Sequence, residues 1–534
     1  MIARWVKFGL TGAALAVGPG NANVPPTDLL IRGGTIYPGG GAPFRGDVLI
    51  RGDRIVYVGP KASEAATTVI DARGLIVAPG FIDPHTHAGD ALASGDPAAR
   101  LVLPFLMQGV TTAFIGGDGG GDPDIARTYG AGRSGEGVFA QSGRDYGINF
   151  ASYVGFGAVR QMVMGAADRT PTAPELARMT DLVSGAMCQG ALGLSTGLFY
   201  APQSFAKTGE VVALARAAAA KGGIYDSHLR DESSYSIGLK GAVREALTIG
   251  REAGIPVHIA HIKALGVDVQ GQAGEIVAMV EAARAAGQVV HADQYPWSAS
   301  GTGLSAALLP RWAQDGARAA MLARFDDVAV LRRMRPEIVD NLRRRGGPAS
   351  LLITSGPAGV EGKTLEAIAT ERRVDPVEAA IAILKQREAG VASFNQSEAD
   401  IAVFMRQPWV VTSSDASQGH PRYYGSFARK YATYVREKQV IDLRRFIDAS
   451  TVATAAMFGL EGRGQLKAGA VADVIAFDPA RFAPRADYVH PTRFATGVRT
   501  VVVNGRLAVA DGAPTGIAAG RPLPRRPTPG SCGG

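Results

Sequence analysis

Eight apolar segments of strand length recur along the middle of this chain, and each finishes on or beside a polar residue. They are LIVAPGFID, TTAFIGG, INFASYV, ALGLST, GGIYDSH, PVHIAH, VVHAD and WVVTSSD. Segments of helical periodicity, such as EVVALARAAAAKG and AGEIVAMVEAARAAG, lie between several of them. Eight alternations predict a (β/α)8 TIM barrel, in which the C-terminal ends of the strands converge on one site. A doubly wound sheet is the alternative, but such a sheet gathers its ligands at one switch point.

Short β-patterned segments at both ends of the chain predict a second unit. Residues 27–76 and 466–512 are expected to pair into one small β-sandwich domain that flanks the barrel domain, residues 77–465. Between the seventh and eighth strands, the Arg-rich segment 302–350 has helical spacing and predicts a helical insert over the barrel mouth. Residues 513–534 are rich in proline and are predicted to be disordered.

The composition is that of a globular protein, with 46% hydrophobic and 19% charged residues. The net charge of +8 is spread thinly and lacks interleaved aromatic residues, so we expect no nucleic-acid partner. The chain contains two cysteines, Cys188 and Cys532, and we expect neither a disulfide framework nor a cysteine-based zinc site. No segment reaches the roughly 20 uninterrupted apolar residues of a membrane span.

The N-terminal segment 1–23 has the pattern of a signal peptide. Arg4 and Lys7 precede a moderately apolar stretch, which ends in small residues. This pattern predicts a bacterial periplasmic or secreted protein. The sequence leaves open whether the protein forms oligomers.

The predicted strand ends carry residues typical of a divalent-metal site. His85 and His87 are two residues apart, so on an extended strand both imidazoles point to the same face, although such a pair also occurs by chance on polar strand faces. The full set is His85, His87, Asp118, His228, His261 and Asp415. Because imidazole and carboxylate suit Zn²⁺, the joint pattern predicts one or two zinc ions, with an open position for water.

These motifs resemble the amidohydrolase superfamily and, within it, the N-acyl-D-amino-acid deacylase (D-aminoacylase) family. PGFIDPHTH and TSSDAS are similar to the superfamily's metal motifs on strands one and eight. More specific to the deacylases are GALGLSTGLFYAP, GGIYDSHLRDE, HIKALG, ADQYPWSAS and HPRYYGSFAR. The resemblance covers nearly everything from Asp28 to Arg521.

The resemblance implies the hydrolysis of a linear amide bond in an N-acyl-D-amino acid or a peptide-like small molecule. In this reaction a metal-bound hydroxide attacks the amide carbonyl, since a divalent ion lowers the pKa of water and polarises the carbonyl oxygen. Asp415 would accept the water's proton and donate it to the departing amine. Its structural alternative is a helix N-cap after strand eight.

The resemblance also implies a group of substrate contacts. An N-acyl amino acid carries a free α-carboxylate, which a planar arginine and hydroxyl groups bind well. The matching residues are Tyr200, Lys263, Tyr295 and Arg422. The structural alternative for Arg422 and Lys263 is a position at the surface or in a salt bridge, without a contact to substrate. Arg230 and Glu232 are predicted to form an ion pair that supports His228.

The chain departs from the family's pattern at three places. Asp118 stands where D-aminoacylases usually have a cysteine ligand; a carboxylate can still bind zinc or bridge two ions, and the alternative is an Asp in a Gly-rich turn. Phe156 replaces a histidine after strand three, which puts contacts to substrate there in doubt. No lysine lies near Leu194, so the carbamylated-lysine bridge of the hydantoinases cannot form there.

Two other motifs carry no function in our interpretation. Residues 193–197 match G-x-S-x-G, but no helix follows at once, so Ser195 is predicted to be structural. GPAGVEGKT lacks the spacing of a phosphate loop. Two alternatives to a deacylase remain: a dipeptidase or cyclic amidase of the same superfamily, and a non-catalytic barrel that acts as a binding protein. The retained histidines and Asp415 argue against the latter.

Overall fold

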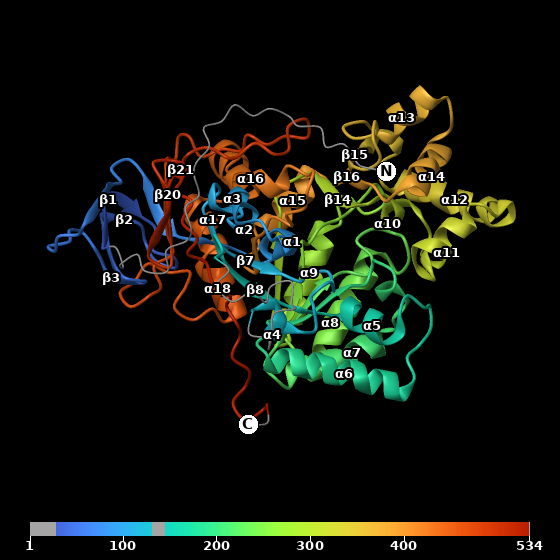
Figure 1. Cartoon of the computed structure of the whole chain (residues 1–534), viewed down its shortest axis with the longest axis horizontal. Helices are drawn as coiled ribbons and strands as arrows, with labels where there is room; N and C mark the ends of the chain where they lie inside the picture. The colour runs from blue at the N-terminus through green and yellow to red at the C-terminus, as the bar shows by residue number, and fades with distance from the viewer. Residues whose placement is uncertain (1–27, 131–144, 533–534) are drawn as a thin grey trace.

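A barrel, a sheet made from both ends of the chain and an insert at the barrel mouth form the structure (Figure 1). It is a computed structural model that describes residues 28–130 and 145–532. The predicted signal peptide, residues 1–23, lies outside the described residues. Within these residues, no helix is both long and apolar enough to cross a bilayer.

The barrel consists of eight parallel strands, which confirms the predicted (β/α)8 fold. They are β6 (Phe81–Asp83), β7 (Val110–Ile115), β8 (Asn149–Ser152), β10 (Gly193–Gly197), β11 (Ile224–His228), β12 (Val257–Ile259), β13 (Val290–Gln294) and β17 (Val410–Thr412). A short strand, β9 (Val154–Gly155), also pairs with β10. The backbone N–H of Leu192 donates to Ser152 between β8 and β10, and a bridge between Thr86 and Ala416 joins β6 to β17. These links close the barrel.

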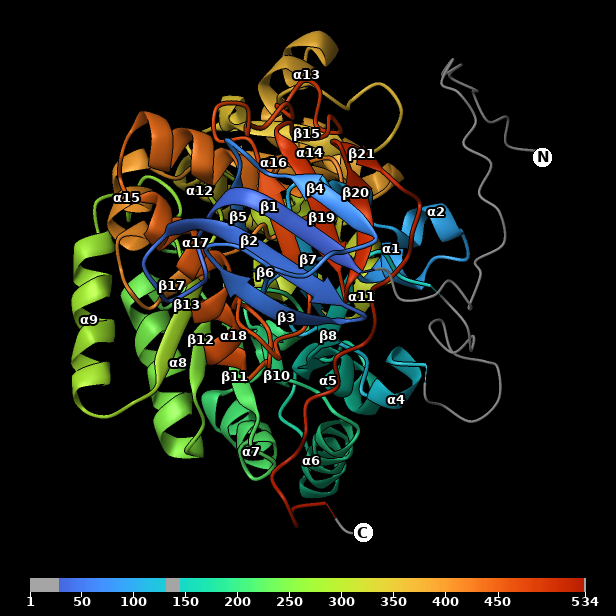
Figure 2. The same ribbon diagram turned by 90° about the vertical axis from the view of Figure 1, so that its left-hand side faces the viewer.

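Helices cover the outside of the strands, as in Figure 2, where α7, α8 and α9 lie side by side. The longer ones are α5 (Phe156–Met164), α6 (Ala173–Cys188), α7 (Thr208–Ala219), α8 (Gly238–Ala253), α9 (Ala273–Ala285), α15 (Glu398–Met405), α16 (Arg422–Arg429), α17 (Leu443–Ser450) and α18 (Val452–Phe458). Short helices α1 (Gly89–Ala93), α2 (Pro97–Arg100), α3 (Leu103–Leu106) and α4 (Ile125–Thr128) follow β6 and β7. Helix α6 begins at a capping box between Thr172 and Glu175. Val183, Val212 and Val243 pack from three helices onto the strands, which buries the apolar stripe of each helix.

The two ends of the chain pair in one nine-stranded sheet beside the barrel. Its strands are β1 (Leu29–Ile36), β2 (Phe44–Arg51), β3 (Arg54–Gly59), β4 (Thr68–Asp71), β5 (Ile76–Pro79), β18 (Val474–Phe477), β19 (Val498–Val503), β20 (Arg506–Ala510) and β21 (Ala513–Pro514). The N-terminal and C-terminal strands meet where β5 pairs antiparallel with β18. The two halves share one core, in which Ile31 and Val48 pack with Val474 and Val502.

The insert after the seventh barrel strand is larger than the predicted segment 302–350. It runs from β14 (Ala299–Gly303) to β16 (Gly390–Phe394), with β15 (Leu351–Ser355) on the other side of β16. Its helices are α10 (Leu304–Leu308), α11 (Ala317–Arg324), α12 (Val328–Arg344), α13 (Leu365–Arg372) and α14 (Pro376–Gln386). They share a separate apolar core. The pairing of β14 with β16 joins residues far apart in sequence, which local periodicity cannot reveal.

The C-terminal tail is ordered as far as it is described, contrary to the predicted disorder of residues 513–534. The backbone N–H groups of Gly520, Leu523 and Arg525 donate to carbonyl groups of the barrel domain at 2.7–2.9 Å. Cys532 forms a disulfide with Cys188 at the end of α6, a single bond that was not predicted from the sequence. Prolines prevent regular structure here, but tertiary hydrogen bonds and the disulfide hold the segment.

Candidate metal centre

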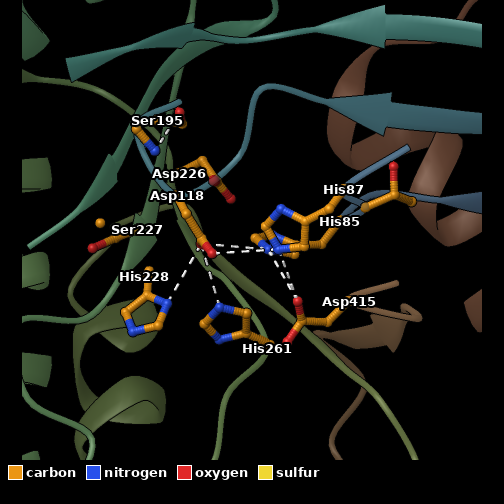
Figure 3. A network of polar contacts seen from close by, with 12 residues as sticks. His85, His87, Asp118, Ser195, Asp226, Ser227, His228, His261 and Asp415 are labelled. Carbon is orange, nitrogen blue, oxygen red and sulfur yellow. Dashed lines mark hydrogen bonds and ion pairs between the residues drawn. The ribbon is translucent and has the colours of Figure 1, made fainter. Parts of the chain in front are cut away.

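The barrel brings all six predicted metal ligands together at its C-terminal mouth (Figure 3). His85 and His87 follow β6, Asp118 follows β7, and His228 is the last residue of β11. His261 follows β12, and Asp415 follows β17. The alternation of strands and helices therefore places residues from five strand ends around one space.

The carboxylate of Asp118 lies at the centre of four histidines. Its Oδ1 is 3.4 Å from His85 Nε2, 3.5 Å from His228 Nδ1 and 3.4 Å from His261 Nε2. Its Oδ2 is 3.6 Å from His87 Nε2. In a tetrahedral zinc site with bonds of about 2.0–2.1 Å, neighbouring ligand atoms are about 3.3 Å apart. The spacing therefore suits ligands that share an ion better than direct hydrogen bonds.

Several of these atoms are buried without any hydrogen-bond partner. Both ring nitrogens of His85 and of His228, and Oδ1 of Asp118, lack a partner in the described part of the chain. Buried polar atoms are normally satisfied, so an unpaired cluster needs an explanation. A divalent cation between the imidazoles and the carboxylates satisfies these atoms together, so the residues fit such an ion.

The backbone at three of the ligands adopts the left-handed conformation, which is strained for residues other than glycine. The φ angles are 54° at Asp118, 35° at His261 and 48° at Asp415. Local hydrogen bonds hold each one: the Gln203 amide donates to the carbonyl of Asp118, and the N–H of His261 donates to Asp293 Oδ1 at 3.0 Å. The N–H of Asp415 donates to the carbonyl of His85 at 2.9 Å.

Asp415 lies between the histidines and an arginine. Its Oδ1 is 3.2 Å from His87 Nε2 and 3.8 Å from His85 Nε2, while its Oδ2 accepts a 2.7 Å hydrogen bond from Arg422 Nη1. Burial alone would raise the pKa of Asp415, but Arg422 and the histidines outweigh burial and hold the pKa below its ordinary value. Asp415 is therefore a carboxylate that can accept a proton.

Glu232 is a site residue that the motif analysis assigned to another role. Its Oε1 accepts a 2.5 Å hydrogen bond from Lys263 Nζ and lies 3.2 Å from His261 Nδ1, while its Oε2 is 3.7 Å from His228 Nε2. These are the ring nitrogens that point away from Asp118. Burial would raise the pKa of Glu232, but Lys263 and the two histidines lower it below its ordinary value. Glu232 therefore supports His228 and His261 on the side of each ring that faces away from Asp118.

The predicted ion pair between Arg230 and Glu232 is wrong. Arg230 binds Glu245 of α8 instead, with Nε at 2.8 Å from Oε2. Arg230 and Glu232 are two residues apart, and the loop turns Glu232 into the barrel mouth. The only available signal for Glu232 was its place four residues after His228 in HLRDE.

A cavity of about 430 Å³ opens beside the candidate ligands, and all four predicted substrate contacts line it. Their partners in the structure differ. Gln396 donates to the hydroxyl of Tyr295 at 2.8 Å, and Lys263 is bonded to Glu232. The guanidinium of Arg422 is bonded to Asp415, so a substrate carboxylate would compete with Asp415 for it.

Two further residues singled out in the sequence lie away from the cavity lining. The Phe156 side chain, at the start of α5, is fully buried in the barrel core, so it replaces the family's histidine with an apolar packing residue. The hydroxyl of Ser195 donates to the Gly116 carbonyl at 2.6 Å and accepts from the Gly119 N–H. Ser195 thus supports the loop that carries Asp118, in line with its predicted structural role.

Comparison with known proteins agrees with this geometry. A family model described as the Amidohydrolase family matches residues 68–509. The chain belongs to the amidohydrolase family. This amidohydrolase is 34% identical to the D-aminoacylase of Alcaligenes xylosoxydans xylosoxydans over 519 residues, which are 94% of this chain and 98% of that protein. The resemblance to the D-aminoacylase family is confirmed.

Solved structures show the same relationship. A D-aminoacylase described with a binuclear metal centre, in which one metal activates and the second attenuates, matches this amidohydrolase with a TM-score of 0.77 and 32% identity. The match covers 94% of this chain and 100% of the other. The N-acyl-D-glutamate deacylase of Bordetella bronchiseptica, complexed with zinc and a phosphonate mimic of the tetrahedral intermediate, matches with a TM-score of 0.77 and 30% identity, over 93% and 99% of the two chains.

Proposed function

We propose that this amidohydrolase uses zinc to hydrolyse the amide bond of N-acyl-D-amino acids. The observation that carries the proposal is the cluster of four histidines and two carboxylates with unpaired buried atoms, beside a cavity lined by Lys263, Tyr295 and Arg422. The relatives that act on N-acyl-D-amino acids support this substrate class, because they match nearly the whole chain. One or two ions fit the donor set.

In the proposed reaction, some residues bind the substrate or orient the metal ligands, and Asp415 transfers the proton. When bound, zinc supplies Lewis-acid chemistry that activates water and polarises the amide carbonyl. Asp415, ionised and within 3.8 Å of two histidines, accepts a proton from the attacking water and passes it to the amine nitrogen as the amide breaks. Lys263 and Arg422 attract the α-carboxylate of the substrate. Glu232 holds His228 and His261 in the orientation that directs their other nitrogens to the centre.

The experiment that tests the substrate class compares three kinds of amide with zinc-loaded protein. N-acetyl-D-methionine, a D-containing dipeptide and a cyclic hydantoin are incubated with it, and the released amine or the opened ring is measured. We expect N-acetyl-D-methionine to have the highest kcat/KM. Preference for the dipeptide or the hydantoin would instead indicate a peptidase or a cyclic amidase of the same family.

We propose further that the protein is exported to the periplasm or the medium. The signal-like pattern of residues 1–23 supports this proposal, as does the Cys188–Cys532 disulfide, because stable disulfides belong mainly to oxidising compartments. Expression of the full chain in a bacterium, fractionation and N-terminal sequencing test it. A mature protein cleaved near residue 23 in the periplasmic fraction is the expected result. An uncleaved protein confined to the cytoplasm would contradict it.

A further inference from the structure

A buried arginine without a carboxylate partner lines the cavity on the side of His228. Arg345 caps the C-terminal end of α12 in the insert, and only 1% of its surface is exposed. Its Nε donates a 2.6 Å hydrogen bond to the hydroxyl of Tyr235, which fixes the plane of the guanidinium. Its Nη1 is buried and has no hydrogen-bond partner in the described part of the chain. Arg345 therefore lines the cavity with a guanidinium that is bonded to a neutral hydroxyl and keeps one buried donor unsatisfied.

A second arginine stands close to the first. The guanidinium carbon of Arg311 lies 3.9 Å from the ring centroid of Phe199 and 5.9 Å from that of Tyr235, while that of Arg345 lies 5.7 Å from the Tyr235 ring. Tyr235 therefore separates the two cations. Burial, together with the charge of Arg345, lowers the pKa of Arg311 to about 10. Two positive charges thus share one weakly solvated region.

Neither charge is neutralised by the protein nearby. Among the described residues, no carboxylate oxygen lies within 4.0 Å of a side-chain nitrogen of Arg311 or Arg345, whereas Arg160 and Arg230 have such partners at 3.1 and 2.8 Å. The charge of Asp231 reaches Arg311, but its oxygens accept backbone N–H groups of its own loop. Unpaired buried charge is unfavourable, and an anion that enters the cavity relieves it.

The pair and Arg422 are associated with different candidate metal ligands. Phe199 and Tyr200 pack on His228, with ring centroids 5.9 and 4.8 Å apart, so the pair belongs to the His228 side of the cavity. Arg422 belongs to the Asp415 side. A substrate whose α-carboxylate approaches Arg422 therefore presents another part of its structure to Arg345.

We propose that Arg345, with Arg311 behind it, forms a subsite for a second carboxylate of the substrate. The proposal rests on the proposed deacylase function and narrows it to N-acyl-D-amino acids with two negative charges. The second carboxylate belongs either to the amino-acid side chain or to the acyl group, because both adjoin the scissile amide. Arg345 is the residue that binds it, through a charge-assisted hydrogen bond from the free end of its guanidinium.

The test compares acids with their neutral amides in zinc-loaded protein. One pair is N-acetyl-D-glutamate and N-acetyl-D-glutamine, and the other is N-succinyl-D-alanine and its terminal amide. We expect kcat/KM of the acid to exceed that of the amide by about tenfold or more in one pair, which identifies the source of the carboxylate. In Arg345→Met this ratio falls to near one while the zinc content is kept. Arg332→Met, on the exposed face of the same helix, serves as the control and keeps the ratio.

Equal kcat/KM values for acid and amide in both pairs, measured with the wild-type protein, would overturn the subsite whatever the Arg345 variant does. The proposed deacylase function would still stand. No hydrolysis of any of the four compounds would instead reject the proposed function. The subsite is then tested by calorimetry with glutarate and its monoamide. Tighter binding of glutarate by about tenfold, lost in Arg345→Met, supports the subsite, and equal affinities reject it.

Discussion

At the scale of single residues, the centre depends on a carboxylate at a position where D-aminoacylases usually have cysteine. Asp118 faces four histidines at 3.4–3.6 Å, and its backbone is held in a strained conformation by the Gln203 amide. A harder oxygen ligand in place of sulfur retains zinc binding and allows the two oxygens to face different ions.

Replacement of Asp118 by alanine is expected to lower the affinity for zinc by more than about 100-fold, since loss of a ligand exceeds the effect of losing a supporting residue. Asp118→Cys is the matched variant and should retain zinc, because a thiolate is also a zinc ligand. Metal content after dialysis against a chelator measures both. Full metal content and activity in Asp118→Ala would show that Asp118 is only a turn residue.

Arg422 sets the pH range in which Asp415 is ionised. Because Arg422 lowers the pKa of Asp415, its replacement by methionine raises that pKa, and the carboxylate becomes protonated at a higher pH. The acidic limb of the kcat/KM profile should therefore move upward by about 1–3 pH units in Arg422→Met. Arg429→Met, on the same helix, is the control. An unmoved acidic limb would mean that Asp415 is not the base.

The six candidate ligands were predictable because each stands at the end of an apolar strand, where periodicity marks both the strand and its polar terminus. Glu232 and Arg345 were not identified as site residues. Glu232 lies in a loop whose path depends on the cap formed by Asp231, and Arg345 lies in an insert that reaches the site only through tertiary packing. Local sequence patterns cannot predict these contacts.

At the scale of elements, the loop after β11 joins the ligand set to its support. Glu232 from this loop contacts His228 at its start and His261 and Lys263 from the next strand end. The loop thus couples two strand ends. The insert adds a wall to the cavity, and its β14–β16 pairing fixes that wall to the chain entering β17.

Glu232→Gln keeps the size of the side chain and removes its charge. The negative charge that faces Nδ1 of His261 and Nε2 of His228 is then lost, and we expect the affinity for zinc to fall about 10–100-fold. Competition with a chromophoric chelator measures it. Glu245→Gln, which breaks the neighbouring Arg230 pair without contacting either histidine, should leave zinc affinity unchanged. An equal loss of zinc affinity in both variants would mean that the substitutions only destabilise the loop.

At the scale of the whole molecule, contacts between distant segments hold the barrel closed and anchor its ends. The prediction of the barrel and of the paired chain ends succeeded, because alternating patterns over many residues reflect global architecture. The ordered tail was missed, since its stability comes from hydrogen bonds to β8 and from the Cys188–Cys532 bond rather than from its own composition.

Removal of this disulfide should destabilise the fold without affecting the chemistry. Cys188→Ser and Cys532→Ser are each expected to lose about 2–5 kcal/mol of unfolding free energy, because the unfolded chain regains a long open loop. The double variant should lose no more than either single variant. Thermal unfolding with and without reductant measures the effect, and a wild-type melting temperature insensitive to reductant would contradict it.

The most direct test of the account is the stereochemical preference of the protein after zinc is removed and restored. Amine release from N-acetyl-D- and N-acetyl-L-amino acids is measured before chelation, after it and after addition of zinc. We predict turnover of the D enantiomers that disappears with the metal and returns with zinc, while the L enantiomers remain poor substrates. Equal turnover of both enantiomers, or D turnover that persists without metal, would contradict the account.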